Sequence, residues 1–191
     1  MKINNLNLNI TSTQQLREWF LENHDKVNEL WISIKFGKPI DDGNLYYIDA
    51  VEQALCFGWI DTTKKKYNDI VIQKFTPRRK NSNWTELNKE RCRRLNKLGL
   101  MHQYGYKLCH QYLNEEFVID NQIMNLIKSD EETFQNFKKL PDLYVRIRID
   151  NIQSYKDNPV LFKNWLTKFL NYTKKNKLYG MWNDYERLTK Y

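Results

Sequence analysis

The chain is poor in the residues that shape secreted scaffolds and disordered segments. Its 191 residues include three cysteines, six glycines and four prolines. The cysteines, Cys56, Cys92 and Cys109, are odd in number and none belongs to a C-x-x-C pair, so they predict reduced thiols in a cytoplasmic protein. The low glycine and proline content argues against collagen-like and disordered classes.

Long apolar runs and catalytic signature motifs are also missing. No stretch approaches ~18 uninterrupted apolar residues, so we expect no membrane-spanning helix. The segment Met1–Asn5 opens no apolar run resembling a signal peptide. The motifs H-E-x-x-H, G-x-x-x-x-G-K-[ST], G-x-G-x-x-G and G-x-S-x-G are all absent. His24, His102 and His110 lack metal-ligand spacing, and the sequence therefore predicts neither a metal nor a cofactor.

Positive charge is abundant and concentrated in one window. The formal net charge is +8. The segment Lys64–Lys97 holds twelve basic residues and three acidic ones (Asp69, Glu86 and Glu90), a net +9, so the remainder sums to −1. A localised field of this kind attracts anions. We expect the partner to be an anionic small molecule, a nucleic acid or an acidic protein.

Hydrophobic periodicity predicts a mixed N-terminal part. A helix is expected near Gln14–Asn23, where Ser12 and Gln15 form a capping box. Alternating apolar residues predict a strand over 30–36. A second helix is expected over Tyr47–Phe57 and ends at Gly58. The runs 59–61 and 70–75 predict a hairpin around a polar turn, and a third helix is expected to begin at Asn83 and end near Leu98.

Beyond residue 113 the periodicity is helical. A helix is predicted over Tyr144–Ile152, and Asn158-Pro159 predicts another helix start, followed by Trp165, Phe169 and Tyr172. The predicted fold class is therefore α+β, with the order helix-strand-helix-strand-strand-helix followed by a helical C-terminal part. We expect an α+β domain over residues 1–112 and a helical region over 113–191, packed on the first.

Three linked motifs carry a resemblance to a known family. They are 54–61 (Ala-Leu-Cys-Phe-Gly-Trp-Ile-Asp), 75–80 (Phe-Thr-Pro-Arg-Arg-Lys) and 82–89, which begins Ser-Asn-Trp-Thr and ends Asn-Lys. In this order they resemble the YdeI/OmpD-associated family, also labelled bacteriocin-protection proteins. The resemblance implies a compact bacterial cytosolic protein with a role in stress or bacteriocin protection, sometimes grouped with the YjbR/CyaY-like fold. It implies no agreed activity. Thr62 stands where the family usually has glycine.

The same motifs contain the candidate binding residues. Arg78, Arg79 and Lys80 follow a strand and precede a predicted helix start, and guanidinium groups beside free helix N–H donors make an anion site. The alternative is a solvated turn that pairs with carboxylates. Trp59 and Trp84 either present aromatic faces to a ligand or fill the core. The full predicted site is Trp59, Asp61, Thr76, Arg78, Arg79, Lys80, Trp84, Asn88 and Lys89.

Several functions remain open from these residues. The first is a non-enzymatic protein that binds an anionic ligand. The second is a small cofactor-free enzyme using Asp61, Arg78 and Arg79. The third is a nucleic-acid-binding or protein-interaction module that uses the basic 64–97 window. Cys56 is expected to be a buried small hydrophobe and not a nucleophile, because a helix C-terminus raises a thiol pKa.

Overall fold

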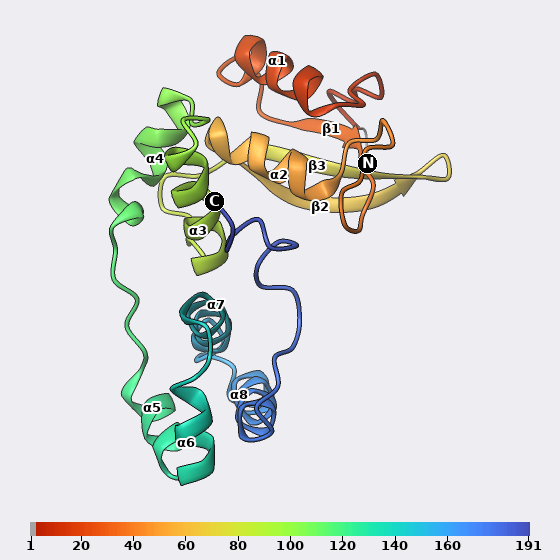
Figure 1. Ribbon diagram of the computed structural model, residues 1–191. Helices are drawn as coiled ribbons and strands as arrows, with labels where there is room; N and C mark the ends of the chain where they lie inside the picture. Colours follow the sequence, from red (N-terminus) through yellow and green to blue (C-terminus); the bar gives the residue numbers. More distant parts are fainter. Residues whose placement is uncertain (1–2) are drawn as a thin grey trace. The chain divides into compact units, whose positions relative to one another are not determined.

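The computed structural model describes residues 3–191, and these form three strands and eight helices (Figure 1). The predicted α+β class with a helical C-terminal part is confirmed. Contacts divide the chain into two units. The first runs to Asn83 and includes Arg91–Asn114, and the second comprises Trp84–Glu90 and Glu115–Tyr191. No helix within residues 3–191 has both the length and the apolarity needed to cross a bilayer.

The first two helices begin and end where local sequence signals place them. Helix α1 (Thr13–Asn23) has the predicted capping box, with Ser12 accepting from the Gln15 amide and Gln15 reaching back to the N-cap. Helix α2 (Tyr47–Cys56) stops before Gly58, whose φ of +72° lies in the left-handed region that favours glycine.

The sheet consists of β1 (Leu30–Ser33), β2 (Trp59–Tyr67) and β3 (Ile70–Pro77), in the order β1-β3-β2 with antiparallel pairing. The predicted hairpin is confirmed. Strand β2 is longer than expected, because only Asn68 and Asp69, both with positive φ, form the turn. Strand β1 is shorter than the predicted 30–36, since the chain beyond it bridges to Tyr46 instead of following β3.

The core of the first unit lies between the sheet and the first two helices. Tyr47 at the start of α2 donates a hydrogen bond to Asp61 of β2 (2.7 Å), and Figure 1 draws α2 across the strands. The largest buried side chains here are aromatic and branched: Phe20, Trp31, Phe57, Trp59, Phe75, Leu16, Leu30, Ile32, Leu55 and Ile72.

Helix α3 (Glu86–Lys97) begins three residues later than predicted. The sequence suggests a cap at Ser82 or Asn83, but the Arg78 guanidinium donates to the Ser82 hydroxyl (3.1 Å) and to the Asn83 carbonyl (2.9 Å). The first turn is capped instead by Thr85, whose hydroxyl accepts from the Asn88 amide at 3.3 Å. The helix N-terminus predicted at Ser82–Trp84 therefore lies at Thr85 and Glu86 instead.

Helix α4 (Gln103–Leu113) has no counterpart among the predicted elements. Its N-cap is His102, whose Nδ1 accepts from the Tyr104 amide at 3.3 Å. Gly105 lies against the end of α2: a Cβ built there would be 2.2 Å from the Cys56 carbonyl oxygen. This close approach places α4 beside α2.

The second unit is helical. Its helices are α5 (Asn121–Lys128), α6 (Glu131–Phe137), α7 (Asp142–Gln153) and α8 (Pro159–Lys174). Helices α7 and α8 confirm the two predicted C-terminal helices, and Asn158 caps α8 with proline in the first turn. The core is made by Ile123, Ile127, Tyr144, Val145, Ile149, Ile152, Leu166 and Phe169.

The first turn of α3 packs within this second unit. Asp150 accepts the Glu86 amide at 3.0 Å, and Arg146 forms ion pairs with Glu86 (2.9 Å) and Glu90 (3.0 Å). Leu87 packs beside Leu143, Ile147 and Leu188. Residues 84–90 therefore belong with the helical unit, whereas a boundary after residue 112 assigns them to the α+β domain.

Candidate functional site

The predicted anion site at the end of β3 consists of one buried arginine and two exposed cations. Arg78 is 8% exposed, and its hydrogen bonds hold the segment that follows β3. Burial lowers the pKa of its guanidinium, while the charge of Asp61 acts in the opposite direction. Arg79 and Lys80 are exposed. The contacts of Arg78 give it a structural role, and the side chains open to solvent are those of its two neighbours.

The β-strand members of the predicted site lie on different faces of the hairpin. Trp59 is fully buried, its ring makes edge contacts with Trp19 and Phe20, and its indole N–H donates to the His24 carbonyl (3.1 Å). It fills the core and does not present a face to solvent. Asp61 is half-buried. Thr76, paired with Ile60, is half-buried on the opposite face of the sheet.

The remaining members, Trp84, Asn88 and Lys89, belong to the second unit. Trp84 is 5% exposed, so its side chain is core and not a stacking platform. Lys89 forms ion pairs with Glu86 (3.0 Å) and Glu115 (2.5 Å).

Part of the charge in the 64–97 window is paired with carboxylates from other segments of the chain. Lys74 pairs with Glu29 and Lys89 with Glu115, whereas Lys66 pairs with Asp69 of the window itself (2.7 Å). Arg94 pairs with Glu52 at 2.7 Å, and Arg93 donates to the carbonyl oxygens of Tyr112 and Leu113. Net charge along the sequence therefore overstates the field that this window presents to a ligand.

The three cysteines are buried free thiols in the first unit. Burial raises the pKa of the Cys56 thiol to about 11, which confirms the expectation that it is a buried side chain at the end of α2. A thiol with this pKa is protonated at neutral pH and is a poor nucleophile.

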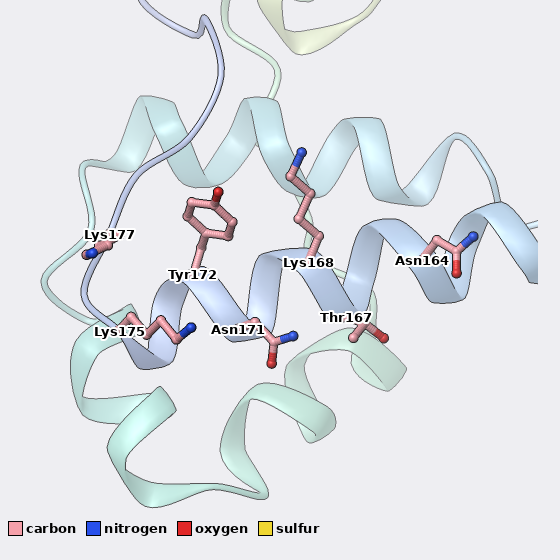
Figure 2. Close-up of a pocket in the computed structure, with 7 residues that line it drawn as sticks. All are labelled: Asn164, Thr167, Lys168, Asn171, Tyr172, Lys175 and Lys177. Atoms are coloured by element: carbon pink, nitrogen blue, oxygen red, sulfur yellow. The ribbon is translucent and has the colours of Figure 1, made fainter.

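The candidate site that the structure adds is a pocket along α8 in the second unit (Figure 2). Its volume is about 510 Å³, within the ~300–1,000 Å³ typical of small-molecule sites. It is lined by Asn164, Thr167, Lys168, Asn171, Tyr172, Lys175 and Lys177. These include three ammonium groups, two amides and two hydroxyls, and no carboxylate.

Helix geometry brings these side chains together. Asn164, Lys168, Asn171 and Lys175 recur at three- or four-residue spacing, which places them along one side of α8. Figure 2 shows Lys168 and Tyr172 extending from the same side of the helix, with Lys177 on the segment that follows it. The pocket is thus built by one helix and the chain leaving its C-terminus.

Two aromatic rings lie close to the ammonium group of Lys168, one of the lining lysines. The Lys168 ammonium lies 4.7 Å from the centroid of the Tyr179 ring and 5.2 Å from that of Trp165. The Tyr172 and Tyr179 rings are 4.8 Å apart. Burial raises the pKa of Tyr179 to about 12, so its hydroxyl stays neutral. The Arg148 guanidinium lies 4.9 Å from the centroid of the same Tyr179 ring, so this ring contacts two cations, Lys168 and Arg148.

None of the three lining lysines forms an ion pair with a residue in the described part of the chain, 3–191. The neighbouring Lys174 differs, because it pairs with Asp130 at 2.8 Å and is not one of the lining residues. Unneutralised ammonium groups beside neutral hydrogen-bond donors suit an anion that carries several oxygens.

Sequence reasoning missed this pocket. Residues 159–177 contain five lysines and no acidic residue, but the sum of −1 over the chain outside 64–97 conceals them. The spacing of Trp165, Phe169 and Tyr172 predicts only a core-facing stripe on this helix. The signal in the sequence is this local group of lysines, together with the three- or four-residue spacing of Asn164, Lys168, Asn171 and Lys175. No three His, Cys, Asp or Glu side chains are grouped as a metal site within residues 3–191.

Comparison with known proteins places the chain in a family. The chain matches no curated protein and no solved structure. Residues 8–108, more than half of its 191 residues, match the model of a domain of unknown function, DUF8412. The α8 pocket lies outside the matched segment. The chain therefore belongs to the DUF8412 family, whose function is unknown.

Proposed function

We propose that this protein is a non-enzymatic binding protein for an anionic ligand and that the α8 pocket is its binding site. The observation that carries the proposal is the pocket lining, where Lys168, Lys175 and Lys177 have no carboxylate among them. Three nearby cations raise the electrostatic potential of the pocket, and a bound anion would lower the repulsion between them. Neutral amide and hydroxyl donors would then fix its orientation.

The relationship to the YdeI/OmpD-associated family is part of the same proposal. It rests on the motif residues 54–61, 75–80 and 82–89. If the chain is related to this family, the protein would bind its ligand in the bacterial cytoplasm, as part of stress or bacteriocin protection. Exposed Arg79 and Lys80 would supply a second, weaker point of attraction for anions.

The test is a calorimetric titration of the full chain with inorganic phosphate and with pyrophosphate at low salt. We expect both anions to bind, with pyrophosphate the tighter because it presents more oxygens to the lysines. Changing Lys168→Gln should weaken binding at least about tenfold, since one charge-assisted hydrogen bond contributes ~1.5–3 kcal/mol. Both anions should be recovered unchanged by phosphorus NMR, because no chemistry is proposed.

The matched control is Lys163→Gln, an exposed lysine of α8 that does not line the pocket. It removes the same charge from the same helix and should leave affinity within about twofold. If the two variants lost the same affinity, the anions would be responding to the net charge of the helix and not to the lining of the pocket, and the proposed site would be refuted. Absence of binding of both anions at millimolar concentration and low salt would refute the proposal.

A further inference from the structure

A second concave site lies in the first unit, where β1 ends and β3 begins. It has a volume of about 360 Å³, near the lower end of the range for ligand sites. Its lining is Ile10, Thr11, Ser33, Ile34, Lys35, Phe36, Asn44, Leu45, Ile70 and Val71, which we call the strand-end groove. Ile10, Ile34 and Leu45 are buried and form an apolar floor.

The walls of the strand-end groove are apolar and open to solvent. Phe36, Ile70 and Val71 are 44%, 37% and 38% exposed. Phe36 is held in place because its ring stacks on Tyr47 at 5.1 Å. Single exposed apolar side chains are common, but three that line one concavity make a continuous surface suited to an apolar side chain.

One unneutralised cation lies over this apolar wall. The Lys64 ammonium of β2 is 4.7 Å from the Phe36 ring centroid, and Lys64 forms no ion pair with any residue of the described chain. Lys35, in the lining itself, differs because Asp42 binds it. That hydrogen bond holds the pKa of Asp42 down to about 2. The charge available to a ligand is therefore that of Lys64.

We propose that the strand-end groove binds an extended peptide in which an apolar side chain is adjacent to Asp or Glu. The apolar side chain would occupy the groove, and the carboxylate would pair with Lys64. Thr11, Ser33 and Asn44 supply polar groups for the peptide backbone. A second copy of this chain fits less well, since each copy carries a net +8 and the two would repel.

The probe is a capped hexapeptide of alternating glutamate and leucine, titrated into the isotopically labelled full chain. Amide chemical shifts should move at Ser33, Ile34, Ile70 and Val71. A peptide with alanine in place of leucine, and another with lysine in place of glutamate, should each bind at least tenfold more weakly. Either substituted peptide binding as well as the original would overturn the proposal, as would shifts confined to other residues.

Charge reversal at the rim supplies the decisive variant. Lys64→Glu should weaken the glutamate peptide at least tenfold and should strengthen the lysine peptide. Lys107→Glu is the control, since Lys107 is an exposed lysine of α4, which packs against the end of α2, whereas Asn44 and Leu45 of the groove precede the start of α2. Equal effects of the two reversals would overturn the Lys64 contact. Analytical ultracentrifugation should show a monomer at every peptide concentration. If the chemical shifts of groove residues instead changed together with self-association, the occupant of the groove would be a second copy of the chain and the proposal would be overturned.

Discussion

Gly105 illustrates how one residue fixes the packing of a helix. A Cβ at this position would lie 2.2 Å from the Cys56 carbonyl oxygen and 2.6 Å from its carbon, and both belong to the backbone. Neither atom is free to rotate away. The absence of a side chain at Gly105 is therefore what allows α4 to approach the end of α2.

We predict that Gly105→Ala destabilises the protein by up to about 2 kcal/mol, measured from denaturant midpoints. Overpacking of this kind costs ~1–3 kcal/mol and outweighs the ~1 kcal/mol that alanine adds to helix stability. Gln103→Ala, at an exposed position of the same helix, should leave the midpoint unchanged. A Gly105→Ala variant at least as stable as the original protein would show that helix propensity prevails and that the contact is softer than its geometry implies.

Residue chemistry also explains which site residues the sequence could identify. The burial of Cys56 follows from its place at the end of an apolar helix. Tryptophan is usually well buried, which already makes core packing one of the two alternatives for Trp59. The function of Arg78 was not predictable, because its partners Ser82 and Asn83 resemble the start of a helix. Only the folded chain shows that the guanidinium uses these groups.

At the scale of elements, α4 depends on an unusual cap. His102 serves as N-cap and also stacks on Phe57 (4.9 Å) and meets the His24 ring edge-on at 4.9 Å. Burial lowers the pKa of His102, and the charges of His24 and Arg17 act in the same direction. The folded protein therefore holds His102 neutral over a pH interval in which the unfolded chain protonates it.

The sign of the pH dependence follows from this shift. Because the unfolded chain binds more protons in that interval, stability falls as the pH is lowered from ~6.5 through the depressed folded pKa of His102. We predict that His102→Asn, which keeps a side-chain acceptor for the Tyr104 amide, loses less melting temperature between pH 7 and pH 5 than the original protein. His110→Asn, at an exposed position of α4, should retain the original dependence. If the melting temperatures of His102→Asn and of the original protein depended on pH in the same way, His102 would not be the source of this pH dependence.

Elements with local signals were predictable, and those set by tertiary contacts were not. The capping box of Ser12, the left-handed Gly58 and the Asn158-Pro159 start all act through neighbouring backbone groups, so sequence spacing reveals them. Helix α4 has a glycine in its first turn and a histidine cap, both of which lower its intrinsic signal. The α8 pocket was missed for a related reason, since it requires Lys177 from beyond the helix.

At the scale of the whole molecule, α3 is shared between two units. Its first two turns carry Glu86 and Glu90, both buried and both paired with Arg146. Burial raises the pKa of Asp150, the residue that accepts the Glu86 amide. Tyr191 donates to Glu90 at 2.8 Å. The helical unit thus encloses a group of charges contributed from a segment that precedes most of it in the sequence.

We predict that a fragment ending at Asn114 is less stable than the full chain. Removing the rest of the protein leaves the buried carboxylates of Glu86 and Glu90 without their ion-pair partner Arg146. It also exposes the apolar surface of Trp84 and Leu87 to water. Breaking a buried ion pair from one side costs ~3–5 kcal/mol. Hydrogen exchange should show the amides of 86–90 losing protection in the fragment, while those of α2 retain it. A fragment with the melting temperature of the full chain would contradict this expectation.

The shared helix also limits how such a chain can be recombined. A segment cut at the end of the matched family region, residue 108, carries the first turn of α3 away from the helices that enclose it. Transplanting that segment into another protein would transfer a tryptophan and two carboxylates adapted to surroundings left behind. Exchange of the family domain between proteins therefore requires compensating substitutions at Trp84, Glu86 and Glu90, or transfer of the C-terminal helices together with it.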